Sequence, residues 1–210
     1  MKRWGWLLVA CLWGCAERDN PYDPANLVSR SVDTTAKLPV PAAGIRVVLP
    51  DSAGRSSAYY GNIQSALADL DPGDTLWVQG GITYPTMGLN LSHGGARLLP
   101  VVLRSFGGEA RVLARSSVPN CLIISQGWAK ITGFAFVGAT GPAVRTIGDS
   151  AIAGDVWIDS SRIDSSYTAL DVRNLLGTLH LHSLSMTGDS LVPPVYFENV
   201  SALDTLQLHW

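Results

Sequence analysis

Short apolar segments recur along the second half of the chain at intervals of about 25 residues. Each segment is five to eight residues long, contains β-branched or aliphatic residues and is bounded by small or polar ones, which favours strands over helical repeats. The first series places an apolar residue at Ile131, Ile158, Leu181 and Leu208, with spacings of 27, 23 and 27. The second series interleaves with it at Leu122, Val144, Leu170 and Val195, with spacings of 22, 26 and 25. Two strand series alternating at this spacing predict a stacked β-solenoid.

In such a solenoid each strand pairs in parallel with its copy one coil away, so that inward side chains stack into aliphatic columns. Small residues are expected at a shared corner, and an apolar residue is expected to close each unit. These positions are Gly133, Ser160 and Ser183 for the corner, and Phe136, Ile163 and Met186 for the closing residue.

Composition agrees with a chain that buries many strands. Of its 210 residues, 47% are hydrophobic and only 15% are charged, which argues against an intrinsically disordered protein. The 15 basic and 17 acidic residues are nearly balanced, and no basic block occurs, so nucleic acid is not an expected partner.

The segment "AYYGNIQSALADLDPGDTLWVQGGITY" (58–84) predicts a short helix before a strand. Its apolar residues Ile63, Ala66, Leu67 and Leu70 fall on one helix face. Asn62 is a candidate N-cap, and the turn at 71–74 ends the helix before a strand at 75–79. We expect this helix to cover the open end of the first coil.

The same segment resembles the entry of right-handed parallel β-helices of the pectin-lyase-like superfamily. The matching residues are Ile63-Gln64, Ala66-Leu67, Pro72-Gly73-Asp74 and Tyr84, and residues 100–113 resemble the next coil. The resemblance implies an all-β, right-handed parallel β-helix with a short N-terminal capping helix and about five or six coils, over residues 45–210. Asn174 and Asn199 share a turn position and resemble the stacked asparagine ladder of these proteins.

The first 14 residues have the form of a signal peptide, with Lys2 and Arg3 before an apolar run too short to span a bilayer. Its end, Leu12-Trp13-Gly14-Cys15, resembles the bacterial lipobox, which implies lipid attachment at Cys15. An ordinary secretory signal is the alternative. Residues 15–44 predict an extended tether, and "DNPYDP" (19–24) resembles the segment that follows the lipidated Cys in some surface lipoproteins. We therefore expect membrane attachment through the lipid anchor, at the outer membrane or cell surface of a Gram-negative bacterium.

Outward positions on the predicted strands are the candidate functional sites. Those rich in aromatic, His, Arg and carboxylate groups, which suit saccharide binding, are Trp157, Asp159, His180, His182, Arg145, Asp171, Arg173 and Tyr196. The alternative is that they are solvated side chains and weak ion pairs. Asp159, His182 and His209 would bind a metal only if all three faced one point, and no metal site is predicted. Cys121, the lone Cys after the anchor, is interpreted as a buried apolar residue.

Two function classes remain open. The first is a non-catalytic module that binds glycan or has a structural role. The second, which the superfamily resemblance implies, is a lyase or glycoside hydrolase acting on acidic polysaccharide. A lyase would need an Arg or Lys base, for which the candidates are Lys130, Arg145, Arg162 and Arg173. It would often use Ca²⁺ held by clustered acids, and no such cluster is evident in the sequence. Apart from Ca²⁺ in the lyase alternative, no cofactor is expected.

The segment "LDTLQLHW" (203–210) aligns with residues 176–183, which places Leu206 and Leu208 beside Leu179 and Leu181. No cap follows this alignment. We therefore expect further β-helix coils, or self-association, at the C-terminal edge.

Overall fold

A computed structural model describes residues 43–50, 57–115, 117–147, 152–188, 195–198, 200, 202–204 and 208–209. These belong to one compact unit, Val32–Trp210. The predicted signal peptide, Cys15, nearly all of the predicted tether and Asn199 lie outside the described residues.

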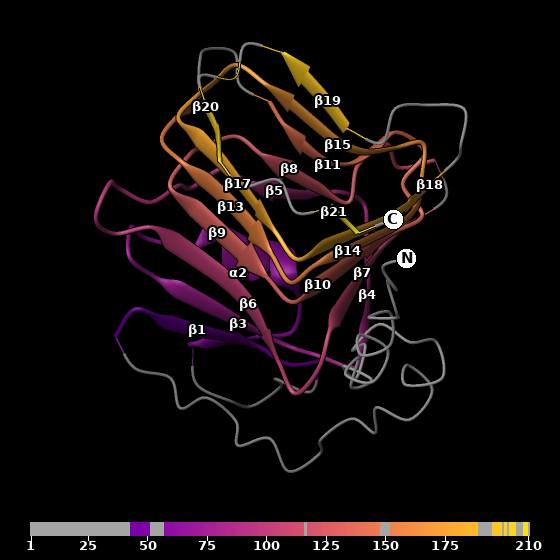
Figure 1. Cartoon of the computed structure of the whole chain (residues 1–210). Helices are drawn as coiled ribbons and strands as arrows, with labels where there is room; N and C mark the ends of the chain where they lie inside the picture. The colour runs from indigo at the N-terminus through magenta and orange to yellow at the C-terminus, as the bar shows by residue number, and fades with distance from the viewer. Residues whose placement is uncertain are drawn as a thin grey trace, which may run out of the picture. The chain divides into compact units, whose positions relative to one another are not determined.

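The described chain forms a parallel β-helix of about five turns, which confirms the expected fold class. Three stacks of parallel strands form the sides of each coil, and Figure 1 shows them around a common interior. We call them sheets A, B and C.

Sheet A contains, in spatial order, β2 (Tyr59–Tyr60), β1 (Ile45–Val48), β3 (Thr75–Gln79), β6 (Val101–Phe106), β9 (Ala129–Thr132), β13 (Val156–Asp159), β17 (Thr178–His182) and β20 (Ala202–Asp204). Sheet B contains β21 (Leu208–His209), β18 (Leu184–Gly188), β14 (Arg162–Ser166), β10 (Phe134–Val137), β7 (Ala110–Ala114) and β4 (Thr83–Thr86). Sheet C contains β19 (Val195–Glu198), β15 (Thr168–Arg173), β11 (Pro142–Thr146), β8 (Leu122–Ile124) and β5 (Leu89–Leu91). The short strands β12 (Ile152–Ala153) and β16 (Leu175–Leu176) pair at one corner.

The predicted inward columns are present over most of their length. Ile158 pairs with Ile131 and Leu181 in sheet A. The second series forms sheet C, with Leu122 paired to Val144, Val144 to Leu170, and Leu170 to Val195. The closing residues Phe136, Ile163 and Met186 form a third series, sheet B, rather than the end of a two-strand unit.

The corner between sheets A and B explains why the sequence breaks there. Gly133, Ser160 and Ser183 each follow a sheet A strand and have positive φ angles of 80°, 45° and 50°. A single residue in this left-handed region turns the chain sharply from one strand into the next. Small residues are therefore favoured at this corner, as the repeat predicts.

A second corner, before sheet A, is lined by stacked glycines. A Cβ built on Gly94 would clash with the backbone of Gly127, and one on Gly127 would clash with the backbone of Ala153 and Gly154. A Cβ built on Gly177 would likewise clash with the backbone of Gly154. Successive coils approach so closely here that no side chain fits between them.

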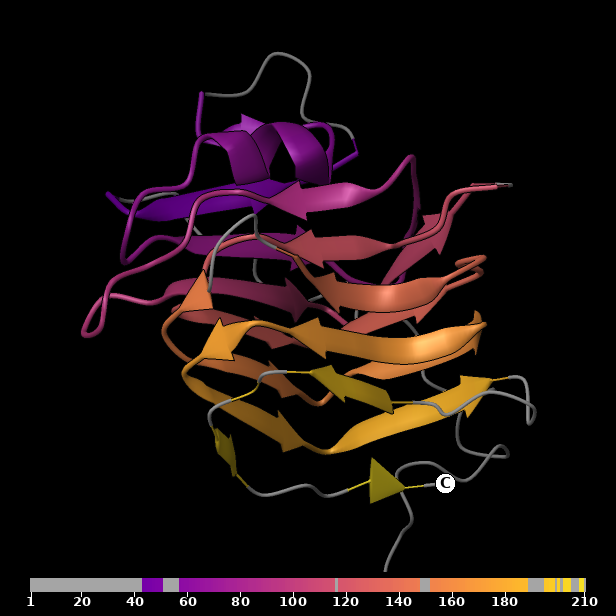
Figure 2. The same ribbon diagram turned by 90° about the horizontal axis from the view of Figure 1, so that it is seen from above.

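The capping helix is α2 (Ile63–Ala68), and the side chain of Asn62 accepts a hydrogen bond from the Ser65 amide at 2.8 Å. Its apolar face is buried against the first coil, and Figure 2 shows the helix at the N-terminal end of the stack. Gln64 lies beside the edge of sheet C. Its Oε1 accepts from the Asn90 amide at 2.8 Å, and its Nε2 donates to the Asn90 carbonyl at 3.4 Å. One side chain thus replaces the hydrogen bonds that a further strand would make.

The alignment of the last coil is wrong. Leu208 pairs with Leu184 in sheet B and not with Leu181 in sheet A. The sheet A strand of this coil is β20, which pairs Leu203 with Leu179 and Asp204 with His180. The apolar alternation of "LQLHW" matches either sheet equally well, so sequence similarity assigned it to the wrong side of the coil.

Cys121 is completely buried, as predicted, and burial raises the pKa of its thiol. Among the described residues, no helix has both the length and the apolar character needed to span a membrane.

Candidate functional site

The eight candidate residues lie on two separate outer faces of the β-helix. Trp157, Asp159, His180 and His182 project from sheet A, whereas Arg145, Asp171, Arg173 and Tyr196 project from sheet C. The two groups are therefore two candidate sites rather than one.

The aromatic residues of sheet A pack mainly on one another. Trp157 and His180 are stacked at 4.9 Å with an interplanar angle of 6°. Trp128, which precedes β9, lies 6.5 Å from Trp157. One face of the Trp157 ring is taken by His180, so this column acts as a packing ladder along the stack. It offers little free ring face to a sugar.

Asp159 and His182 form a second pair on sheet A, with Oδ1 and Nδ1 at 2.9 Å. The hydroxyls of Ser160 and Ser183 contact the same two groups at 3.1 and 3.2 Å. His209 does not extend this column, because it pairs with Ser185 in sheet B. The described residues include no group of three His, Cys, Asp or Glu side chains arranged to hold a metal ion.

Sheet C carries a depression with a volume of about 330 Å³. It is lined by Pro142, Arg145, Tyr167, Thr168, Asp171, Arg173 and Tyr196. All four sheet C candidates are thus brought together. Tyr167, Thr168 and Pro142 were missed. Pro142 and Thr168 pair two residues before Val144 and Leu170, so alternation placed them on the inward face and gave no signal of their position in the depression.

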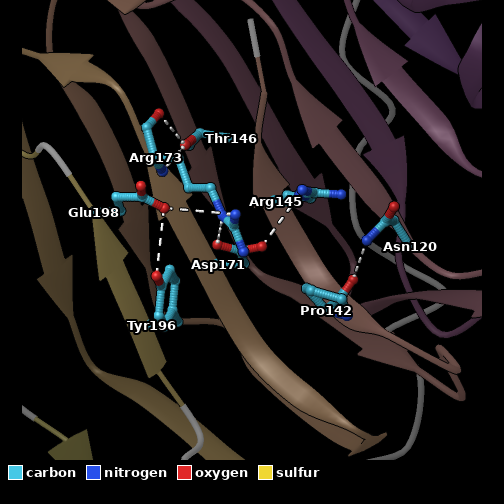
Figure 3. A network of polar contacts seen from close by, with 8 residues as sticks. All are labelled: Asn120, Pro142, Arg145, Thr146, Asp171, Arg173, Tyr196 and Glu198. Atoms are coloured by element: carbon cyan, nitrogen blue, oxygen red, sulfur yellow. Dashed lines mark hydrogen bonds and ion pairs between the residues drawn. The ribbon is translucent and has the colours of Figure 1, made fainter.

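Asp171 is one of the residues that line the depression, and Figure 3 shows it between two arginines. Its Oδ1 accepts a hydrogen bond from Nε of Arg173 at 2.7 Å, and its Oδ2 lies 3.2 Å from Nε of Arg145. Only 5% of the Asp171 side chain is exposed. A buried carboxylate needs such compensation, because removing an unpaired charge from water is costly.

Arg173 is held from several sides. The hydroxyl of Thr146 accepts from the Arg173 amide at 2.8 Å and donates to its carbonyl at 3.1 Å. The guanidinium lies 4.8 Å from the centre of the Tyr196 ring, and its Nη1 lies 3.5 Å from Oε2 of Glu198. The hydrogen bond to Asp171, with the nearby negative charges, raises the pKa of Arg173 above its ordinary value. Arg173 is therefore a fixed cation.

The guanidinium of Arg145 has fewer contacts than that of Arg173. Its Nε faces Asp171 without hydrogen-bond geometry, and 30% of its side chain is exposed. No other partner of Arg145 occurs among the described residues. Since both arginines face Asp171 through Nε, the outer nitrogens of Arg145 remain available for an acceptor.

The predicted asparagine ladder is placed only in part. Asn174 directly follows β15 and has a φ of 55°, and its backbone amide donates to the Glu198 carbonyl at 2.9 Å. This bond fixes the position of β19 next to β15. The other member, Asn199, lies outside the described residues.

Comparison of the chain with protein-family models, with curated proteins and with solved structures finds no match in any of the three. The assignment of a parallel β-helix therefore rests on the strand order and parallel pairing in the structure itself.

Proposed function

We propose that this chain is a surface-anchored lipoprotein of the pectin-lyase-like type whose β-helix binds an acidic glycan in the sheet C depression, without catalysis. One observation carries the proposal: two arginines and two tyrosines surround a single hollow, and Arg145 has outer nitrogens without a partner in the described chain.

The chemistry of the hollow suits a charged sugar. Tyrosine rings stack on the apolar face of a pyranose, and Tyr167 is more than half exposed beside the hollow. A guanidinium binds a carboxylate or sulfate through two parallel hydrogen bonds. Asn120 supports the rim, because its buried amide donates to the Pro142 carbonyl at 2.6 Å. Arg145 would take the anionic group and Tyr167 the ring.

The enzyme alternative has weaker support. A lyase base must give up its proton, and the pKa of Arg173 is raised by its hydrogen bond to Asp171. The pKa of Arg162 is raised likewise by its hydrogen bond to Glu109. Both groups stay protonated and are poor bases. Asp171 is already engaged by two cations, which makes it a poor acid or nucleophile.

Lipid anchoring at Cys15 is part of the same proposal and rests on the lipobox resemblance. In cells fed labelled palmitate, the wild-type chain should become labelled and the Cys15→Ser variant should not. Equal labelling of both, or of neither, would contradict the anchor.

Binding is tested with the purified full chain by titration calorimetry against hexamers of galacturonate and of glucose. Arg145→Ala and Tyr167→Ala should each weaken galacturonate binding about tenfold, in line with one lost charge-assisted contact or ring contact. Arg111→Ala, which removes an exposed arginine from sheet B, is the control and should bind normally. Absence of galacturonate binding would refute the proposal, and unsaturated products in the same incubations would favour the lyase.

A further inference from the structure

We infer that Glu198 acts as a competitor beside the sheet C depression: its carboxylate occupies, at Arg173, a second position for an anionic group of the glycan, next to the one proposed at Arg145. The inference rests on the proposed glycan binding and adds how that binding is limited.

The two carboxylates at Arg173 are held very differently. Asp171 accepts a 2.7 Å hydrogen bond from Nε and is almost completely buried. Glu198 lies 3.5 Å from Nη1, beyond the length of a good hydrogen bond, and its side chain is 45% exposed. Asp171 is therefore a fixed part of the site, whereas Glu198 is loosely associated with it.

The remaining contact of Glu198 is equally weak. Its Oε2, the same oxygen that faces Arg173, accepts from the Tyr196 hydroxyl at 3.3 Å. Within the described part of the chain, a rotation of the Glu198 side chain into solvent would break only these two contacts. The backbone would stay in place, because the Glu198 carbonyl accepts from the Asn174 amide.

Once Glu198 has moved, Arg173 and Tyr196 present on the wall of the depression two donors that had converged on a single carboxylate oxygen. A ligand carboxylate or sulfate would make the same two contacts. The exchange also changes the local charge. Arg145, Arg173 and Asp171 together carry one positive charge, which Glu198 neutralises in the unbound state.

The consequence is that Glu198 lowers the affinity for anionic ligands and leaves neutral ones unaffected. Glu198→Gln keeps the shape of the side chain and removes its charge. Because an exposed ion pair is worth about 0.2–1 kcal/mol, the variant should bind the galacturonate hexamer about 1.4- to fivefold more tightly than wild type. Binding of the glucose hexamer should be unchanged.

Glu109→Gln is the matched control. Glu109 is a carboxylate of similar exposure (39%) paired with an arginine, but that partner is Arg162 on sheet B. Its neutralisation changes the net charge of the protein by the same amount and should leave galacturonate affinity at the wild-type value. A sulfated hexamer tests whether sulfate serves as well as carboxylate, and a gain with either anion supports the competitor role.

The outcomes separate the two proposals. If the wild type binds galacturonate and Glu198→Gln binds it with equal or lower affinity, the competitor role is overturned while the glycan site remains supported. An equal gain in Glu109→Gln would also overturn it, because the effect would then be one of net charge. Failure of both wild type and Glu198→Gln to bind any hexamer would overturn the site and the competitor together.

Discussion

Ile131, in the inward column of sheet A, allows a quantitative test of which residues of strand β9 point into the core. This residue is completely buried in β9 and pairs with Leu103 on one side and Ile158 on the other. Ile131→Ala removes three carbon atoms, each worth about 0.8 kcal/mol of transfer free energy. The neighbouring side chains are fixed by their own strands and can collapse only partly into the space, so a cavity term adds to this loss. We expect the free energy of unfolding to fall by about 3–4 kcal/mol.

The control is Lys130→Ala, one residue earlier on the same strand. Lys130 points outward and is exposed, so the change should lie within about 0.5 kcal/mol of wild type. Urea unfolding followed by tryptophan fluorescence measures both. With a slope of about 2 kcal/mol/M, Ile131→Ala should lower the midpoint by about 1.5–2 M and Lys130→Ala by less than about 0.3 M. Equal shifts, or a larger shift for Lys130→Ala, would refute the assignment of inward and outward positions.

Two further changes probe the glycine corner and a buried tyrosine. Gly127→Ala should destabilise the fold by several kcal/mol, because the new methyl group would overlap the backbone of the next coil; Gly61→Ala, at an exposed position, should cost far less, and similar melting temperatures would contradict the close approach. Burial raises the pKa of Tyr84 above its ordinary value of about 10. Its contribution to stability is therefore complete below pH 10 and is lost as the pH rises above 10, since only the unfolded state then releases the proton. Unfolding measured from pH 9 to 12 should show a shallower decline for Tyr84→Phe than for wild type, and parallel curves would exclude this role.

The fold was predictable where side-chain demands repeat from coil to coil. Ile131, Ile158 and Leu181 revealed the inward column because each must fill the same interior. Gly133 marked a corner because a left-handed turn tolerates few residues. The alignment of the last coil was wrong for the opposite reason. Alternation predicts an inward position for Leu208 but does not indicate to which sheet it belongs. Three sheets share one alternation pattern, and only the lengths of the turns distinguish them.

The candidate site was predictable as a set of outward residues but not as a cavity. The column containing Arg145 and Asp171 follows directly from the pairing of β11 with β15. That Asp171 is buried while its neighbours are exposed depends on how two arginines fold over it, which no spacing encodes. Tyr167 precedes its strand, so no strand column includes it.

The position of Gln64 has a consequence for how the chain assembles. Its amide gives sheet C a finished first edge, contributed by a helix that leaves the ribosome before any strand of that sheet. Strand β5 then has one open side, toward β8, and each later strand meets a single free edge in turn. The first edge of sheet C is therefore closed to a further strand at Asn90, so this sheet can be extended beyond its described strands only from the opposite edge, at β19.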